Sequence, residues 1–353
     1  MRLWEKNIRQ VVPYVPGEQP AGDKIIKLNT NENPYPPAPG VKKVLADMEA
    51  DRLRKYPDPT ASVLVKELAA YYGLGEDQVF VGVGSDDVLA MSFLTFFNSD
   101  KPVLFPDVTY SFYKVWADLF KVPFETPALK EDFTIDTKDY AKENGGVIFP
   151  NPNAPTGVYM PLDQVEEILK ANQDVVVIVD EAYVDFAGPS AMELLDKYEN
   201  LLVVQTFSKS RSMAGMRIGF AMGHPDLIRA LNDVKYSYNS YTMNLPSLLA
   251  GVEAVKDKSY FESTLAKIVA TRERSKKRLA ELGFTFPDSR SNFIFASHKT
   301  VPAGKIFEAL KKEQIYVRYF KTPGLDNSLR ISIGTDEEMD ALFRFLEAYL
   351  PNA

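Results

Sequence analysis

The stretch 201–220, LLVVQTFSKSRSMAGMRIGF, places a lysine shortly after an apolar run. Residues 201–204 are apolar without interruption, which is typical of a strand covered on both faces of a sheet. Lys209 follows between Ser208 and Ser210, where the strand is expected to open onto a polar loop. Most lysines in such loops are simply exposed. A function for Lys209 therefore depends on what the other strand ends bring to the same place.

Similar apolar runs recur through the middle of the chain, and helical patterns separate most of them. The runs are residues 79–81, 103–105, 147–149, 175–179, 201–204 and 218–222. Repeated β-α-β units of this kind predict an α/β fold, with a large domain built on a mostly parallel sheet flanked by helices.

The two ends of the chain differ from the middle. Residues 1–32 are rich in proline and glycine, and we expect an N-terminal arm that packs with a second, smaller domain. Residues 33–248 would form the large domain. Residues 249–353 combine a long charged helical stretch, two short strand patterns at 292–296 and 329–333, and a final helix, which predicts a small α+β domain.

Composition excludes several classes of function. The net charge of -7 argues against a nucleic-acid surface. The chain has no cysteine and only two histidines, which leaves little material for a metal site or a Ser-His-Asp triad. No apolar run approaches the roughly 20 residues of a membrane span, and no signal peptide is evident. These features predict a cytoplasmic enzyme without a metal.

Ligands of open parallel sheets bind outside the carboxyl ends of the strands. After residues 79–81 the chain reads GVGSD, which can bind an anion at a helix N-terminus but is equally common as a plain turn. Asp180 and Glu181 follow residues 175–179, as a surface pair or as buried groups that need a cation. Together with Lys209, this set suits pyridoxal phosphate, which needs an amine, a carboxylate and an anion site.

The order of four motifs, GxGSD, PNxPTG, DEAY and SK with an arginine eight residues after the lysine, resembles the fold-type I, class I/II pyridoxal-phosphate-dependent aminotransferases. More narrowly, residues 10–350 are similar to the histidinol-phosphate aminotransferases. The narrower resemblance depends on VPY at 12–14, LNTNENP at 28–34, KYPD at 55–58, YVR at 316–318 and LRI at 329–331.

The resemblance implies roles for single residues. Lys209 would bind the cofactor as an imine and then move a proton between the substrate α-carbon and the cofactor. Asp180 would pair with the pyridine nitrogen, and Tyr183 with the ring hydroxyl. The remaining cofactor contacts would be Gly84, Ser85, Asp86, Ser208 and Arg217 at the phosphate, Tyr110 on the ring face, and Tyr56 from the second subunit of a homodimer.

One position departs from the family pattern. Where the family often has asparagine before the proline of PNNPTG, this chain has Ala154, which cannot donate a side-chain hydrogen bond. We expect Asn153 to replace it in the cofactor site, unless a water does so or Tyr183 acts alone.

The resemblance implies a substrate that carries a phosphate group. This group would bind Arg330 and Arg318, because a phosphate dianion favours more than one cationic partner. Composition alone is equally consistent with Arg318 as an ordinary surface arginine on a strand. Tyr14 of the arm would complete the phosphate site. The segment Asn31-Glu32-Asn33, with Asn33 as the predicted substrate contact, is expected near the imidazole end, although an Asx turn before Pro34 explains the same pattern.

These roles imply a ping-pong transaminase of histidine biosynthesis, which passes through pyridoxamine phosphate. It would exchange an amino group between L-histidinol phosphate and 2-oxoglutarate, giving imidazole-acetol phosphate and glutamate. An aromatic aminotransferase and a threonine-phosphate decarboxylase are alternatives with the same cofactor. A non-catalytic pyridoxal-phosphate-binding regulator is disfavoured, because the acidic chain has no spare segment for a DNA-binding domain.

Overall fold

A computed structural model describes residues 2–22 and 24–353. The large domain contains a sheet in the order β2-β8-β7-β6-β5-β3-β4. Its strands are β2 (Val79–Gly82), β3 (Val103–Leu104), β4 (Phe124–Glu125), β5 (Gly146–Pro150), β6 (Val177–Asp180), β7 (Leu201–Thr206) and β8 (Gly219–Gly223). All six predicted runs form strands. The expectation of parallel direction is wrong for β8, which is antiparallel to both β2 and β7. The short edge strand β4 was not predicted.

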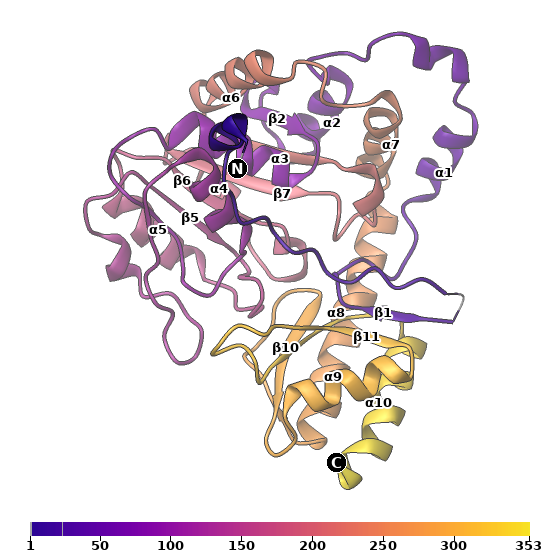
Figure 1. Ribbon diagram of the computed structural model, residues 1–353. Coiled ribbons are helices and arrows are strands. Elements are labelled where there is room, and N and C mark those ends of the chain that lie inside the picture. The colour runs from indigo at the N-terminus through magenta and orange to yellow at the C-terminus, as the bar shows by residue number, and fades with distance from the viewer. Residues whose placement is uncertain (1, 23) are drawn as a thin grey trace.

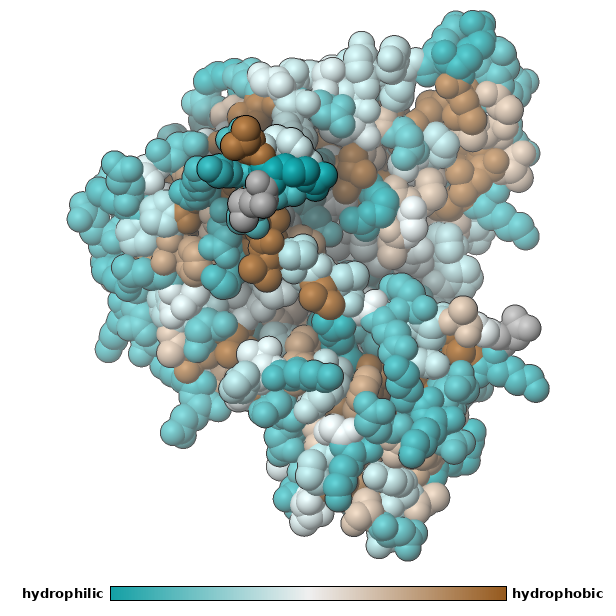
Figure 2. Space-filling view, in the orientation of Figure 1, coloured by the Kyte–Doolittle hydropathy of each residue, from teal (hydrophilic) through white to brown (hydrophobic). Residues whose placement is uncertain are grey.

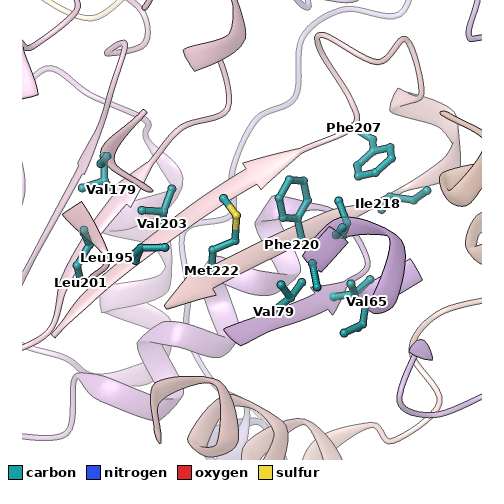
Figure 3. Close-up of a cluster of buried hydrophobic side chains, with 14 of the residues drawn as sticks. Val65, Val79, Val179, Leu195, Leu201, Val203, Phe207, Ile218, Phe220 and Met222 are labelled. Carbon is teal, nitrogen blue, oxygen red and sulfur yellow. The ribbon is translucent and has the colours of Figure 1, made fainter. Parts of the chain in front are cut away.

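The continuous apolar runs reflect two hydrophobic cores, one on each face of this sheet. Leu201 and Val203 of β7 enter the first core, whereas Leu202 and Val204 enter the second. Figure 3 shows part of the first core, where Val79, Val203 and Phe220 converge from three strands. Helices α1 (Pro39–Ala46), α2 (Ser62–Tyr72), α5 (Leu162–Ala171) and α7 (Leu245–Lys256) supply the first core, and α3 (Ser85–Phe96), α4 (Phe112–Phe120) and α6 (Pro225–Tyr238) the second.

The small domain has a five-stranded sheet in the order β1-β11-β12-β10-β9. Its strands are β1 (Ile26–Leu28), β9 (Phe284–Thr285), β10 (Phe293–His298), β11 (Ile315–Tyr319) and β12 (Leu329–Ser332). Its helices are α8 (Lys258–Glu281), α9 (Ala303–Lys312) and α10 (Asp336–Tyr349). Short 3-10 helices occur at Leu3–Asn7, Ala50–Arg54, Glu76–Gln78, Thr137–Tyr140, Val184–Phe186, Ala191–Leu194, Ala214–Met216 and Leu350–Asn352.

The N-terminal arm links the two domains. It runs from the front of the large domain to the small domain (Figure 1), where β1 pairs in parallel with β11. This strand was not anticipated in a segment rich in proline and glycine. The predicted domain boundary at residue 248 falls inside α7, whose buried side chains belong to the first core. α7 ends and α8 begins at Asp257, and Tyr260 of α8 still packs on the first core.

Candidate active site

The carboxyl ends of the central strands open onto a cavity of about 500 Å³ between the arm and the two domains. Eleven of the predicted site residues line it: Tyr14, Ser85, Asp86, Tyr110, Asp180, Tyr183, Ser208, Lys209, Arg217, Arg318 and Arg330. Four others, Asn33, Tyr56, Gly84 and Asn153, are not among its lining residues. The tertiary structure thus gathers at one place side chains that lie as much as 316 positions apart in the sequence, from Tyr14 to Arg330.

Lys209 reaches this cavity from the loop that follows β7. Its amine donates a hydrogen bond to the carbonyl oxygen of Thr30, at 3.1 Å, and lies 5.8 Å from the centre of the Tyr183 ring. Among the described residues, no carboxylate lies within ion-pair distance of this amine. A half-buried lysine with only a carbonyl partner is well placed to react with an aldehyde.

Asp180 ends β6 at the floor of the cavity, with only 4% of its surface exposed. Its carboxylate accepts hydrogen bonds from the Tyr113 hydroxyl, at 2.8 Å, and from the Ala182 N–H, at 3.2 Å. Burial raises the pKa of Asp180 to about 6, although both hydrogen bonds oppose that shift. Among the described residues, no cation lies at ion-pair distance from the Asp180 carboxylate. The protonated nitrogen of a pyridine ring could supply that missing positive charge.

Asp180→Asn should therefore stabilise the cofactor-free protein at neutral pH. The pKa of Asp180 is higher in the folded state (about 6) than its ordinary value of 3.8. The free energy of unfolding is therefore highest below pH 4, where Asp180 is protonated in both states, and it falls as pH rises through 6. The loss at pH 8 is about 3 kcal/mol, at about 1.4 kcal/mol per pKa unit. We expect the variant to melt at a higher temperature than the native protein at pH 8, with a smaller gap at pH 5. A pH-independent gap would contradict this account.

An anion site forms where β8 passes the turn between β2 and α3. A Cβ atom on Gly219 would lie 2.2 Å from the backbone nitrogen of Ser85, so only glycine permits this approach. Gly84 has a positive φ of 88° and precedes Ser85, the first residue of α3. Arg217 lies 3.5 Å from both the Asp86 carboxylate and the Ser208 hydroxyl. Helix N–H groups, two hydroxyls and a guanidinium thus face one another, as a phosphate requires.

Two tyrosines flank the cavity. The Tyr110 hydroxyl donates to the Asp86 carboxylate at 2.7 Å, and burial, with this carboxylate, raises the pKa of Tyr110 well above its usual value. The Tyr183 hydroxyl accepts a hydrogen bond from the side chain of Asn31 at 3.0 Å. The sequence placed Asn31 only within the segment 31–33 near the substrate and did not predict its contact with Tyr183. Its left-handed backbone, with φ at 57°, is a conformation that asparagine tolerates better than most residues.

Two predicted residues serve the local structure instead. The Asn153 amide donates to the Val108 carbonyl and the Thr156 hydroxyl, and its oxygen accepts from Thr109. The polar atoms of Asn153 are therefore used in hydrogen bonds to neighbouring loop residues. Its neighbour Ala154, and not Asn153, lines the cavity.

Asn33 forms the Asx turn that was the alternative interpretation. Its side-chain oxygen accepts from the Tyr35 N–H, and its amide donates to the carbonyl of Ser210. Asn33 is therefore engaged in local contacts and does not line the cavity, whereas Asn31 and Glu32 of the same predicted segment do.

Tyr56 lies outside the cavity of its own chain. It is 82% exposed and stacks on Tyr241 with the ring centres 4.6 Å apart. Figure 2 shows apolar side chains gathered over α1 and the segment that follows it. The exposed large apolar residues of this part of the chain include Leu45, Leu53 and Tyr56.

Arg318 and Arg330 are directly opposite each other in the antiparallel pair β11 and β12. Arg330 donates to the Asn29 carbonyl at 3.2 Å, but its buried Nε has no partner, and burial lowers the pKa of Arg330. Arg318 makes only long contacts, 3.4 Å each, to the carbonyls of Val15 and Pro16. In the described part of the chain, neither guanidinium has a carboxylate at ion-pair distance. Because like charges placed opposite each other repel, this pair favours an anionic ligand.

The arm covers this end of the cavity. Tyr14 stacks on Phe112 of α4, with ring centres 4.2 Å apart. The same segment passes Arg318, since a Cβ on Gly17 would lie 3.5 Å from that guanidinium. A ligand held by the arginines would therefore contact the arm as well as both domains.

Residues 23–346 match the family described as "Aminotransferase class I and II". A curated histidinol-phosphate aminotransferase from Clostridium acetobutylicum is 53% identical over 338 residues, 96% of each chain. Another from Brachyspira hyodysenteriae is 51% identical over 345 residues, 98% of each chain. The chain belongs to the histidinol-phosphate aminotransferases, within the class I and II aminotransferase family. The predicted family is thereby confirmed.

The fold of this aminotransferase is also found in solved structures. The crystal structure of histidinol-phosphate aminotransferase from Sinorhizobium meliloti, in complex with pyridoxal-5'-phosphate, superimposes with a TM-score of 0.81. The similarity covers 92% of this chain and 89% of that one, at 24% sequence identity. The predicted fold class, a large α/β domain with a smaller α+β domain, is confirmed.

Neither a metal centre nor a membrane segment was found in residues 2–22 and 24–353. In this part of the aminotransferase, no three histidine, cysteine or acidic side chains are grouped to hold a metal ion. None of its helices is both long and apolar enough to cross a bilayer.

Proposed function

We propose that this protein transfers the amino group of L-histidinol phosphate to 2-oxoglutarate, with pyridoxal phosphate as its cofactor. The products are imidazole-acetol phosphate and glutamate, and the reverse direction makes histidinol phosphate for histidine biosynthesis. The observation that carries the substrate assignment is the arginine pair, Arg318 and Arg330, which lacks a carboxylate partner among the described residues.

The lining of the cavity fits pyridoxal phosphate. When bound, this cofactor supplies a ring that withdraws electrons from the substrate carbon bearing the amino group. Lys209 is the residue proposed to bind its aldehyde and then to take the proton from that carbon. Asp180, buried without a cation, would hold the ring nitrogen protonated. Arg217, with Ser85 and Ser208, would bind the phosphate.

The arginine pair favours a phosphorylated substrate. Histidinol phosphate carries CH2-O-phosphate where an amino acid has its α-carboxylate, so the charge to be matched is larger. Two opposed guanidinium groups can bind such a dianion through several charge-assisted hydrogen bonds. An aromatic amino acid would offer the same pair only one carboxylate. Threonine phosphate offers both groups, and a direct assay must separate it from histidinol phosphate.

The proposed function can be tested in one half-reaction. The purified protein, loaded with pyridoxal phosphate, is mixed with L-histidinol phosphate without a keto acid, and its absorbance is followed. The visible band of the lysine-bound cofactor should disappear, and a near-ultraviolet band of pyridoxamine phosphate should grow. If phenylalanine or tyrosine changes the spectrum but histidinol phosphate does not, the substrate assignment is wrong. Release of carbon dioxide from threonine phosphate would favour the decarboxylase.

We also propose that the active form is a cytoplasmic homodimer in which Tyr56 reaches the cofactor phosphate of the partner subunit. The strong exposure of Tyr56, away from the cavity of its own chain, supports a role across an interface. The absence of cysteine fits a reducing compartment.

Mixed dimers provide a test of this arrangement. Tyr56→Ala and Lys209→Ala should each have low activity, but a dimer of one subunit of each contains one intact site. Random exchange of subunits should therefore restore about a quarter of the native rate. The measurement is activity after the two variants have been unfolded and refolded together, with the separately refolded variants as controls. Activity no greater than the sum of the two controls, or a fully active monomer, would contradict the proposal.

A further inference from the structure

A row of side chains crosses the cavity-facing side of the small sheet. Arg330 of β12 is the direct partner of Arg318 in β11 and of Phe295 in β10. Directly opposed residues share a face, and side chains two positions apart on a strand also do so. Phe320 follows directly after the end of β11, and both guanidiniums lie over its ring. The two proposed substrate arginines are thus flanked by two phenylalanines.

Phe320 contacts both arginines without lining the cavity itself. The guanidinium carbon of Arg318 lies 5.4 Å from the centre of its ring, and that of Arg330 lies 5.7 Å away. The face of an aromatic ring carries partial negative charge and attracts cations within about 6 Å. Among the described residues, Phe320 is the one aromatic ring that lies under both guanidiniums, whereas Phe293 lies only under Arg330, at 5.3 Å. Both arginines line the cavity, where a ligand can reach them.

Two further rings support Phe320 from behind. Phe295 meets it edge-on, with ring centres 6.2 Å apart and planes at 69°. Phe133 of the large domain meets Phe295 in turn, at 6.0 Å and 84°. Phe133 has a positive φ of 64°, in a tight turn where its N–H donates to the Lys130 carbonyl at 2.8 Å. The rings thus connect the large domain to the arginine pair.

We propose that Phe320 is a positioning residue that holds Arg318 and Arg330 together as a binding pair for a phosphate dianion. The inference rests on the proposed function, since it concerns the same substrate site. Two guanidiniums without counter-ions repel each other and would otherwise turn apart toward water. The Phe320 ring offsets that repulsion and restricts their rotamers before the substrate arrives. The cost of ordering the arginines is therefore lowered, which strengthens binding rather than the chemical step.

The alternative is that Phe320 only fills space beneath the arginines. Leucine retains much of the apolar bulk without an aromatic face, whereas tyrosine retains the aromatic face. Phe320→Leu and Phe320→Tyr therefore separate the two explanations. Phe307→Leu is a matched control, because Phe307 packs on Tyr319 in the same domain, with 5.5 Å between ring centres, and in the described part of the chain its ring lies under neither arginine.

The test uses the protein loaded with pyridoxal phosphate and follows single-turnover absorbance. Binding of L-histidinol phosphate is read from the concentration dependence of the rate. Binding of inorganic phosphate is read from its inhibition of the glutamate half-reaction. For Phe320→Leu we expect both to weaken about tenfold, with a nearly unchanged maximal rate. Phe320→Tyr and Phe307→Leu should bind both anions as the native protein does.

Native phosphate inhibition in Phe320→Leu would overturn the proposal, as would equal losses in the leucine and tyrosine variants. The two proposals fail in different ways. If the native protein is inhibited by phosphate but does not react with histidinol phosphate, the proposed function fails while the role of Phe320 is still decided by the inhibition constants. If phosphate does not inhibit the native protein, the arginine pair binds no phosphate, and the proposed role of Phe320 is wrong as well.

Discussion

Lys209→Ala should lower the rate of transamination by about four orders of magnitude or more, because the amine proposed to bind the cofactor is also the one proposed to transfer the substrate proton. Among the described residues, no other lysine lines the cavity. The Lys209 amine has only the Thr30 carbonyl as a partner, and Lys27, the nearest in sequence to that carbonyl, is held by Thr30 and Glu32. The measurement is the rate of amino transfer from L-histidinol phosphate under saturating pyridoxal phosphate.

The variant should also lose the visible absorbance of the covalently bound cofactor. Lys66→Ala, on the exposed side of α2, is the control and should behave as the native protein does. A small primary amine added to Lys209→Ala should restore part of the rate, since the missing proton acceptor is then supplied from solution. Transamination by Lys209→Ala at the native rate would refute the assignment of this residue.

Arg330→Ala should raise the KM for L-histidinol phosphate about 100-fold, while the absorbance of the bound cofactor stays as in the native protein. Removing one partner of a buried charged contact costs roughly 2–5 kcal/mol, and about 1.4 kcal/mol corresponds to a tenfold change. Arg330 is close to that description, because the side chain is half-buried and its buried Nε has no partner among the described residues. The measurement is steady-state kinetics, with cofactor affinity determined separately.

Arg344→Ala, exposed on α10, is the control for loss of a positive charge in the same domain. Arg330→Lys should fall between alanine and the native residue, since lysine keeps the charge but loses the planar fork of donors. Thermal unfolding of each variant checks that the small sheet is intact. A normal KM in Arg330→Ala would remove this residue from the substrate site, and a lost cofactor spectrum would place it in the cofactor site instead.

The elements and the centre of the cavity could be predicted from local patterns. The alternation of Leu201 to Val204 between two cores is a property of neighbouring residues, because successive side chains on a strand point to opposite faces. An uninterrupted apolar run therefore indicates a strand buried on both sides. Lys209 and Asp180 follow such runs, and the ends of parallel strands meet at one edge of a sheet. Both side chains do line the same cavity.

Asparagine positions could not be predicted in the same way. Asn31 and Asn33 are separated by one residue, yet Asn31 bonds to Tyr183 while Asn33 closes an Asx turn. At the next loop, Asn153 binds its own backbone surroundings and Ala154 faces the cavity. An amide can satisfy a local turn or a distant partner equally well. Which one it takes depends on the backbone angles of a loop, and these are set by contacts outside that loop.

The sequence by itself determined the family, six of the seven strands of the large domain and the candidate lysine and carboxylate of the site, because periodicity and motif order are local properties of the chain. The tertiary structure alone decided the antiparallel direction of β8, the pairing of β1 with β11 and the opposition of Arg318 to Arg330. Strand direction and register depend on hydrogen bonds between segments that are distant in the sequence. The composition of either segment does not specify its partner. The aromatic support of the arginine pair is decided at the same level, since its rings come from both domains.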